Sequence, residues 1–255
     1  MLRFRFNIIL VLSLFIFNFY SIAAHAFLHN PREININTTF NGAKLYVSGE
    51  VNSNNNVVVE VLGSDKEEKF KQKGKVWGIF WMTVGHYAFK GVPSIYLMYL
   101  PKSLSHLSQE KFDELNLGYK EVYSRLEINP IPKDKKSLFN EFLKLKQRDK
   151  LYGIYQDQVT YSNITAEKKK YHVEVHLPSR IVPGVYTIKV YEVTPDLKIV
   201  KTESDNFQIK LTGFPAFISN MAFNHSLIYG ILSVIIAIFA GIFMGFLFKD
   251  KGGAH

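Results

Sequence analysis

The residues of this chain best suited to chemistry are His172, Glu174 and His176, which alternate along the sequence. Two histidines four residues apart can share one zinc ion when they lie on a helix. The surrounding sequence, YHVEVHLP, instead predicts a strand, on which the two imidazoles share a face but lie about 13 Å apart. That spacing does not suit joint metal binding. We therefore expect no metal and no cofactor, with the helical zinc site as the less favoured alternative.

Other catalytic motifs are absent from the sequence. There is no His-Glu-x-x-His, Walker loop, Gly-x-Ser-x-Gly elbow or dinucleotide fingerprint. The chain has no cysteine, which excludes disulfides, cysteine-ligated metals and thiol chemistry. Serine, histidine and aspartate residues scattered along the chain could still converge in the folded protein. We expect a protein that is not an enzyme, and keep a hydrolase or a ligand-binding protein as the alternative.

Trp77 and Trp81 lie in an unusually apolar stretch, VWGIFWMTV, at residues 76–84. On a strand, the two tryptophans occupy one face while Phe80 and Met82 occupy the other. Because both faces then require burial, the stretch predicts a central strand of the core. The alternative is an aromatic binding groove, which would be the site of the hydrolase or ligand-binding protein.

The element that must position all of these residues is a membrane anchor at residues 227–248, LIYGILSVIIAIFAGIFMGFLF. A helix of this length spans about 33 Å, and the hydrocarbon core of a bilayer is about 30 Å thick. The stretch carries no charge and no proline, so we predict one transmembrane helix in the lipid bilayer, followed by a short cytoplasmic tail at residues 249–255.

Small residues recur every four positions in this predicted helix and form one strip: Ser233, Ala237, Gly241 and Gly245. A strip of small side chains lets the backbone of another helix approach closely. We therefore expect a membrane-protein partner or self-association through this strip. Small residues are also common in membrane helices in general, so the alternative is that the strip faces lipid.

The N-terminus has the pattern of an export signal. Residues 1–26 begin with Arg3 and Arg5, continue through an apolar run and end in Ala24-His25-Ala26. This order is typical of a secretory signal peptide, and the alternative is an uncleaved anchor. Both place residues 27–226 on the far side of a bacterial inner membrane, in the periplasm. Lys249 and Lys251 agree with a cytoplasmic C-terminus.

The charge of the chain bears on its partners. The full chain has a net charge of +9, and residues 27–226 hold 27 basic and 21 acidic residues. This excess favours anionic lipid headgroups or an acidic partner. The ordinary alternative is a solvated surface of mixed sign. We expect no nucleic-acid partner.

Alternating apolar residues predict strands in the predicted periplasmic part. In AKLYVSGEV, Leu45 and Val47 share one face, as in a half-buried antiparallel strand. Asparagines at 52–56 predict a turn, after which VVVEV is expected to return beside the first strand. A second strand pair is expected from YHVEVHLP and VYTIKVYEV, with a closing strand near residue 209. The charged residues 64–75 predict a solvated hairpin or loop.

The periodicity changes between residues 105 and 152. A helix is expected to begin at a Ser137 cap and to end at Gly153, with a shorter helix near residues 109–115 before it. The fold prediction is therefore mainly β: an immunoglobulin-like β-sandwich ectodomain at residues 27–226 with a helical insertion at 105–152, followed by one C-terminal transmembrane helix.

Several segments together resemble a known family: FNGAKLYVSGEV, VVVEVLG, KVWGIFWM, GVPSIYL, LKQRDKLY, LPSRIVPGVYTIKVY and the YGILSV anchor. They are similar to the alphaproteobacterial transmembrane protein family, a family of unknown function. The similarity covers nearly everything after the predicted signal peptide. Members of that family are often encoded beside permeases that resemble sulfite exporters, so the resemblance implies an accessory role at a transporter and transfers no catalytic residues.

Overall fold

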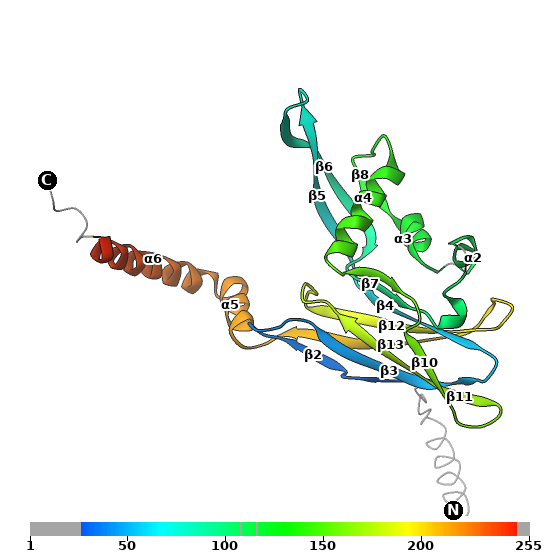
Figure 1. Cartoon of the computed structure of the whole chain (residues 1–255). Helices are drawn as coiled ribbons and strands as arrows, with labels where there is room; N and C mark the ends of the chain where they lie inside the picture. Colours follow the sequence, from blue (N-terminus) through cyan, green and yellow to red (C-terminus); the bar gives the residue numbers. More distant parts are fainter. Residues whose placement is uncertain (1–26, 108, 116, 249–255) are drawn as a thin grey trace, which may run out of the picture.

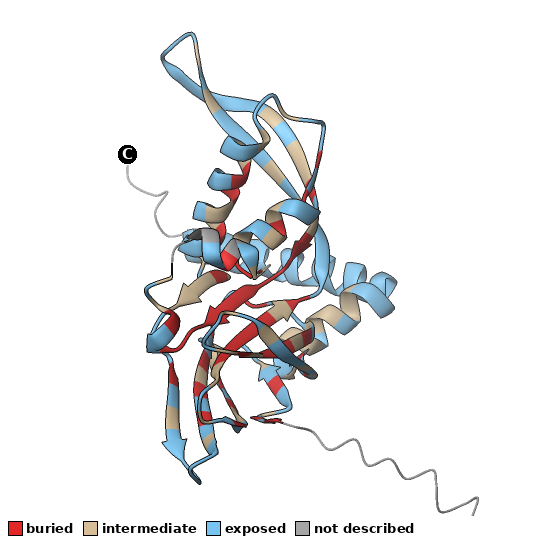
Figure 2. Ribbon diagram, turned by 90° about the vertical axis from the view of Figure 1, so that its right-hand side faces the viewer, coloured by how far each residue is buried: buried red, intermediate tan, exposed pale blue. Residues whose placement is uncertain are grey.

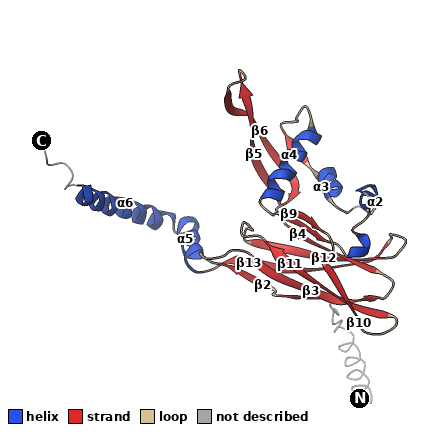
Figure 3. Cartoon of the chain, in the orientation of Figure 1, coloured by secondary structure: helices blue, strands red, loops and turns tan. Residues whose placement is uncertain are grey.

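Two β-sheets packed face to face form the body of the protein, and helices cover the outer side of the larger sheet (Figure 1, Figure 3). The computed structural model describes residues 27–107, 109–115 and 117–248. The predicted signal peptide and the tail at 249–255 lie outside the described residues. A long hairpin at residues 65–93 and the C-terminal helix α6 (Ser226–Phe248) project from the body (Figure 1).

The smaller sheet has four antiparallel strands in the order β1-β3-β11-β10. Their bounds are Phe27–Asn30 for β1, Ala43–Asn52 for β3, Val159–Asn163 for β10 and Lys168–Leu177 for β11. The alternation predicted for β3 is confirmed, because Leu45, Val47 and Val51 are buried while the residues between them are partly or fully exposed. One face of this sheet therefore faces the core and the other faces solvent.

The larger sheet has six strands in the order β2-β13-β12-β4-β7-β9. Their bounds are Glu33–Ile36 (β2), Asn56–Gly63 (β4), Tyr96–Tyr99 (β7), Tyr152–Tyr155 (β9), Gly184–Val193 (β12) and Ile199–Leu211 (β13). The first strand region is split between the sheets, because β1 pairs antiparallel with β3 while β2 runs parallel to β13. This topology confirms the predicted immunoglobulin-like sandwich.

The core between the sheets is built from the inward side chains of both. Val47 and Val175 of the smaller sheet are buried in one cluster with Val59, Ile188 and Phe207 of the larger sheet. A tyrosine corner closes one end of this core, where the Tyr186 hydroxyl donates a hydrogen bond to the backbone oxygen of Val182.

The strand pairs expected from sequence neighbours are wrong. β3 pairs with β11 and β4 pairs with β12, so neither β3 and β4 nor β11 and β12 form a hairpin. The turn at residues 52–56 and the connection at 178–183 each carry the chain from one sheet to the other. Alternation shows which face of a strand is buried, but the same pattern fits a hairpin partner and a strand of the opposite sheet.

Helices fill the connection between β7 and β9 and cover the outer face of the larger sheet. They are the 3-10 turn η1 (Lys102–Leu104), α2 (Gln109–Glu114), α3 (Tyr119–Arg125) and α4 (Lys135–Arg148). A second core lies beneath them, where Tyr96 and Met98 of β7 meet Val122 of α3 and Phe139 and Phe142 of α4. The larger sheet is therefore the middle layer of the body.

The predicted ends of the long helix differ from the observed ones. The Asp134 carboxylate caps α4 and accepts a hydrogen bond from the Ser137 backbone N–H at 2.9 Å, so Ser137 lies inside the first turn. The helix ends at Arg148, and Gly153 lies within β9. The helix ends early because the residues that follow it pair with β7: the N–H of Tyr96 donates a hydrogen bond to the carbonyl of Leu151 at 2.9 Å.

The hairpin at residues 65–93, which we call the arm, extends the connection between β4 and β7. It consists of β5 (Asp65–Val76) and β6 (Phe80–Pro93), and β8 (Glu127–Asn129) pairs with β6 near its base. Figure 2 shows the outer part of the arm in the colour of exposed residues. A short helix, α5 (Gly213–Asn224), joins the sandwich to α6.

Candidate functional site

The histidines considered for metal binding lie on β11, as the sequence predicted. His172 and His176 are both exposed on this strand. The His176 Nε2 is 3.4 Å from Glu174 Oε1, which forms an ion pair when the imidazole is protonated. Within the described ranges, no group of three or more His, Cys, Asp and Glu side chains could hold a metal ion.

Trp77 and Trp81 lie at the far end of the arm, so the prediction of a central core strand is wrong. The N–H of Ile79 bonds to the Val76 carbonyl at 3.3 Å, and Trp77 and Gly78 have φ of +53° and +74°. Positive φ at both central residues is the geometry of a type I′ turn. The exposed fraction is 88% for Trp77 and 68% for Trp81. The tryptophans therefore form an exposed tip.

The outer part of the arm has two different faces. Val76 pairs with Phe80 across the hairpin, and Met82 and Val84 continue the apolar face next to Gly74. A Cβ atom on Gly74 would lie only 2.9 Å from the Val84 side chain, so glycine is what allows this close approach. All four of the large apolar residues 79, 80, 82 and 84 are more than half exposed.

The opposite face of the arm is cationic. Lys75 pairs with Trp81, and its ammonium lies 5.5 Å from the centre of the indole ring. The Lys73 ammonium donates a hydrogen bond to the Thr83 hydroxyl at 2.9 Å. Between residues 69 and 93 the sequence holds five lysines and no acidic residue: Lys69, Lys71, Lys73, Lys75 and Lys90. The arm therefore ends in an apolar tip behind which the charge is uniformly positive.

Acidic residues lie only at the base of the arm, and each has a basic partner. Asp65 pairs with Arg125 at 3.7 Å, Glu67 pairs with Lys90 at 3.4 Å, and Glu68 pairs with Lys146 of α4. The pairs of Asp65 and Glu68 join the base of the arm to α3 and α4, whereas the pair of Glu67 with Lys90 joins the two strands of the arm.

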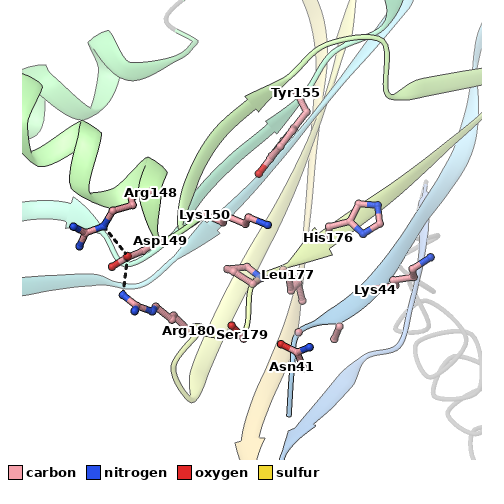
Figure 4. Close-up of a pocket in the computed structure, with 13 residues that line it drawn as sticks. Asn41, Lys44, Arg148, Asp149, Lys150, Tyr155, His176, Leu177, Ser179 and Arg180 are labelled. Carbon is pink, nitrogen blue, oxygen red and sulfur yellow. Dashed lines mark hydrogen bonds and ion pairs between the residues drawn. The ribbon is translucent and has the colours of Figure 1, made fainter. Parts of the chain in front are cut away.

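An open concavity lies where the end of α4 meets the start of β3 and the end of β11 (Figure 4). It has a volume of about 1110 Å³ and is lined by five basic side chains: Lys44, Arg148, Lys150, His176 and Arg180. Figure 4 shows Asp149 between two of them, with its carboxylate 2.7 Å from Arg180 and 3.4 Å from Arg148.

The charge of this concavity suits an anion. Burial favours a higher pKa for Asp149, but the hydrogen bonds and charges of Arg180 and Arg148 outweigh it and hold the pKa below its usual range. Glu174 pairs with Lys44 at 2.6 Å, but Arg148, Lys150 and Arg180 still outnumber the ionised Asp149.

The small residues of α6 lie together on one side of the helix. At 100° per residue, Ser233, Ala237, Gly241 and Gly245 cover a narrow face, and Gly230 and Ala240 fall on the same face. The Ser233 hydroxyl donates to the Tyr229 carbonyl at 2.8 Å, so its polar group is satisfied within the helix. Among the described residues, α6 is the one helix long and apolar enough to cross a membrane.

A family model described as "Putative transmembrane protein (Alph_Pro_TM)" matches residues 27–250. The chain belongs to the Alph_Pro_TM family. This match confirms the resemblance found in the sequence and covers the sandwich, the arm, the helical insertion and α6. No curated protein matches the chain. The family and α6 together fit a single-pass membrane protein.

The larger sheet buries a carboxyl group, that of Glu60 on β4. Its side chain is fully buried, the Tyr191 hydroxyl donates a hydrogen bond to its Oε2 at 2.7 Å, and the Lys189 ammonium lies 4.0 Å from the same oxygen. Burial raises the pKa of Glu60 from its ordinary value of 4.5, and the hydrogen bonds from Tyr191 and Tyr96 and the charge of Lys189 offset only part of this effect. The folded protein therefore retains this proton at a pH where the unfolded chain has lost it.

Glu60→Gln should make the free energy of unfolding of the protein less sensitive to pH. Because its folded pKa is raised, the contribution of Glu60 to wild-type stability is greatest below about pH 4.5 and is lost as the pH rises through the folded pKa. Each unit by which the pKa is raised corresponds to about 1.4 kcal/mol. Urea unfolding of the full chain in detergent at several pH values measures this. Glu50→Gln, at an exposed position, is the control, and equal slopes for Glu60→Gln and wild type would contradict the prediction.

Sequence reasoning predicted a solvated hairpin or loop at residues 64–75 but missed that residues 76–84 form its exposed tip and second strand. The lysines at 69, 71, 73 and 75 alternate with period two, as on a solvated strand. If the chain turns back at Trp77-Gly78, the strand that follows pairs with this solvated strand and is exposed to solvent as well. The basic concavity had no sequence signal, because its residues come from separate parts of the chain.

Proposed function

We infer that the protein is a membrane-anchored, non-enzymatic accessory protein that associates with other components of its membrane. The observation that carries this proposal is the position of the arm tip. Six large apolar side chains between residues 77 and 84 are each more than half exposed at the end of a projecting hairpin. Exposed apolar patches of this kind mark interaction sites, whereas the substrate sites of enzymes are concave.

The proposed topology places the sandwich and the arm in the periplasm, α6 in the inner membrane and the C-terminus in the cytoplasm. The export signal and the positive tail support this orientation. Protease added to spheroplasts should digest the ectodomain and leave a small protected fragment containing α6. Survival of an intact ectodomain in sealed spheroplasts, with digestion after lysis, would contradict this topology.

A permease resembling sulfite exporters is the proposed partner, because the family resemblance implies a role at such a transporter. The contact that supports it within the membrane is the small-residue face of α6. Packing of helices in membranes depends on close approach of backbones, since lipid provides no hydrophobic driving force between helices. The ectodomain would then lie next to the periplasmic side of the permease.

Gly241→Ile should weaken this association by on the order of 1 kcal/mol, because a branched side chain separates the two backbones. The helix stays apolar, so insertion should not change. Crosslinking in native membranes at equal abundance measures the effect on partner capture or self-association. Phe239→Ile, on the opposite face of α6, is the matched control and should have no effect. An unchanged crosslinking pattern for Gly241→Ile would remove the strip from the interface.

The basic concavity favours a second candidate function, a ligand-binding protein that takes a small anion. The concavity takes the place of the aromatic groove predicted near Trp77 and Trp81, because these two side chains are exposed and form no groove. Arg180→Ala would separate the candidates: it would reduce anion binding measured by calorimetry but leave crosslinking to a membrane partner unchanged.

A further inference from the structure

We propose that the tip of the arm inserts into the headgroup region of the membrane that α6 spans, and that the lysines behind it contact anionic lipid headgroups. This inference deepens the proposed function, on which it rests, because it assigns the lipid surface as the contact of the arm. The residues that carry it are Trp77, Ile79, Phe80, Trp81 and Met82 at the tip, with exposed fractions between 54% and 88%.

The composition of the arm matches a membrane interface. Tryptophan is enriched at the level of the lipid headgroups, where its ring is partly in an apolar and partly in a polar environment. Lysine side chains can place their aliphatic stems along apolar surface and keep the ammonium in the headgroup layer. At the tip, Lys75 lies over the ring of Trp81, so the two types of side chain lie at the same level.

The charge of the arm selects an anionic surface. From residue 69 to residue 93 the chain carries five lysines and no acidic residue. Glu67 neutralises Lys90 near the base, which leaves the positive charge concentrated on the outer half of β5. Basic clusters next to a membrane are attracted by anionic lipid headgroups within a Debye length of the surface. A second copy of this ectodomain, itself net positive, would repel the arm.

The shape of the tip favours lipid over a protein pocket. The apolar side chains do not share one face: Phe80, Met82 and Val84 lie on one side of the ribbon, Trp81 lies on the other, and Trp77 and Ile79 lie in the turn. A protein partner would have to enclose the tip from several sides. Lipid molecules can surround the tip on all sides without a preformed pocket.

The arm belongs to a chain that is already anchored in a bilayer. The twelve residues of β5 extend over about 40 Å. Figure 1 shows the arm and α6 leaving the body in different directions. Insertion of the tip therefore requires the ectodomain to rotate about α5 toward the bilayer. This helix buries none of its residues in the described chain, and the non-helical residues Thr212 and His225 bound it. Tethering by α6 keeps the local lipid concentration high.

The tryptophans make the test direct, because Trp77 and Trp81 are the two tryptophans of the chain and both lie at the tip. The purified full chain is reconstituted into vesicles of phosphatidylcholine with phosphatidylglycerol, with and without bromine atoms on the upper acyl chains. We expect blue-shifted tryptophan emission and clear quenching by the brominated lipid. Both effects should be smaller in phosphatidylcholine alone and at high salt. Tryptophan emission typical of a water-exposed indole, quenched by acrylamide but not by brominated lipid, would overturn the proposal.

Two variants separate the apolar and the charged contributions. Ile79→Asp adds a charge to the exposed turn and should abolish the quenching while both tryptophans remain. The triple variant Lys71→Glu, Lys73→Glu and Lys75→Glu should remove the preference for phosphatidylglycerol. Val185→Asp, at an exposed apolar position on β12, is the matched control and should behave as wild type. Far-UV circular dichroism verifies the fold of each variant, and normal quenching in a folded Ile79→Asp variant would contradict insertion of the tip.

Failure of this inference is distinguishable from failure of the proposed function. Tryptophans shielded in native membranes but exposed in lipid vesicles would indicate a protein partner, which overturns lipid insertion and leaves the accessory role standing. A blue shift that disappears on dilution into excess lipid would indicate a second copy, and would also overturn it. Lipid quenching without any crosslinked partner in native membranes would support the inference and remove the accessory role.

Discussion

Phe142→Ala should lower the free energy of unfolding by about 3–5 kcal/mol, because it removes a buried ring from a well-packed core. Phe142 of α4 contacts one ring from each strand of the arm. Its ring centre lies 5.6 Å from that of Phe70 on β5 and 5.0 Å from that of Phe89 on β6. Tyr152 of β9 packs edge-on at 5.5 Å. Truncation to alanine therefore leaves a cavity where the arm, the helices and the larger sheet meet.

Pulse proteolysis of the full chain in detergent, over a range of urea concentrations, measures this effect. Because the cavity lies at the base of the arm, cleavage within the arm should begin at a lower urea concentration than in wild type. Phe217→Ala, which truncates an exposed phenylalanine of α5, is the matched control. A loss below about 1 kcal/mol for Phe142→Ala, no larger than an average substitution, would show that the cluster is not tightly packed.

Glu68→Gln should destabilise the protein by about 3 kcal/mol, because it leaves the Lys146 ammonium buried without a counter-charge. The Lys146 side chain is 6% exposed and that of Glu68 is 25% exposed, so the lower end of the usual range applies. The remaining contacts of the ammonium are the Ser94 carbonyl at 3.5 Å and two aromatic rings, those of Phe142 and Tyr152. None of these supplies a negative charge.

A double-mutant cycle isolates this ion pair. Replacing both residues, with Lys146→Met and Glu68→Leu, should cost much less than the sum of the single substitutions, since no charge is then left buried. Glu141→Gln is the matched control: its exposed pair with Lys144 should change stability by no more than about 0.5 kcal/mol. Equal effects of Glu68→Gln and Glu141→Gln would show that Lys146 reaches water when its partner is removed.

The base of the arm and its tip are stabilised by different means. At the base, the Lys146 to Glu68 pair and the rings around Phe142 hold β5 and β6 against α4. At the tip, the turn and the contacts between β5 and β6 stabilise the hairpin. Substitutions at the base should therefore change stability, whereas substitutions at the tip should change binding with little effect on folding.

The sequence alone determined the features that depend on local composition. An uncharged run of 22 residues forms a membrane helix because no other structure satisfies its backbone in lipid, and α6 was predicted within one residue of its observed start. The burial of Leu45 and Val47 followed from alternation, because successive side chains of a strand face opposite sides. The mainly β sandwich was predictable for the same reason.

The tertiary structure decided which surfaces meet, because those contacts join residues far apart in the sequence. Pairing of β3 with β11 brings together residues more than a hundred positions apart, and no local pattern encodes that choice. The basic concavity likewise depends on where α4 ends beside β11. The exposure of Trp77 and Trp81 was decided in the same way. An apolar strand is buried only when another layer packs against it, and the arm carries residues 76–84 beyond the reach of both sheets and the helices.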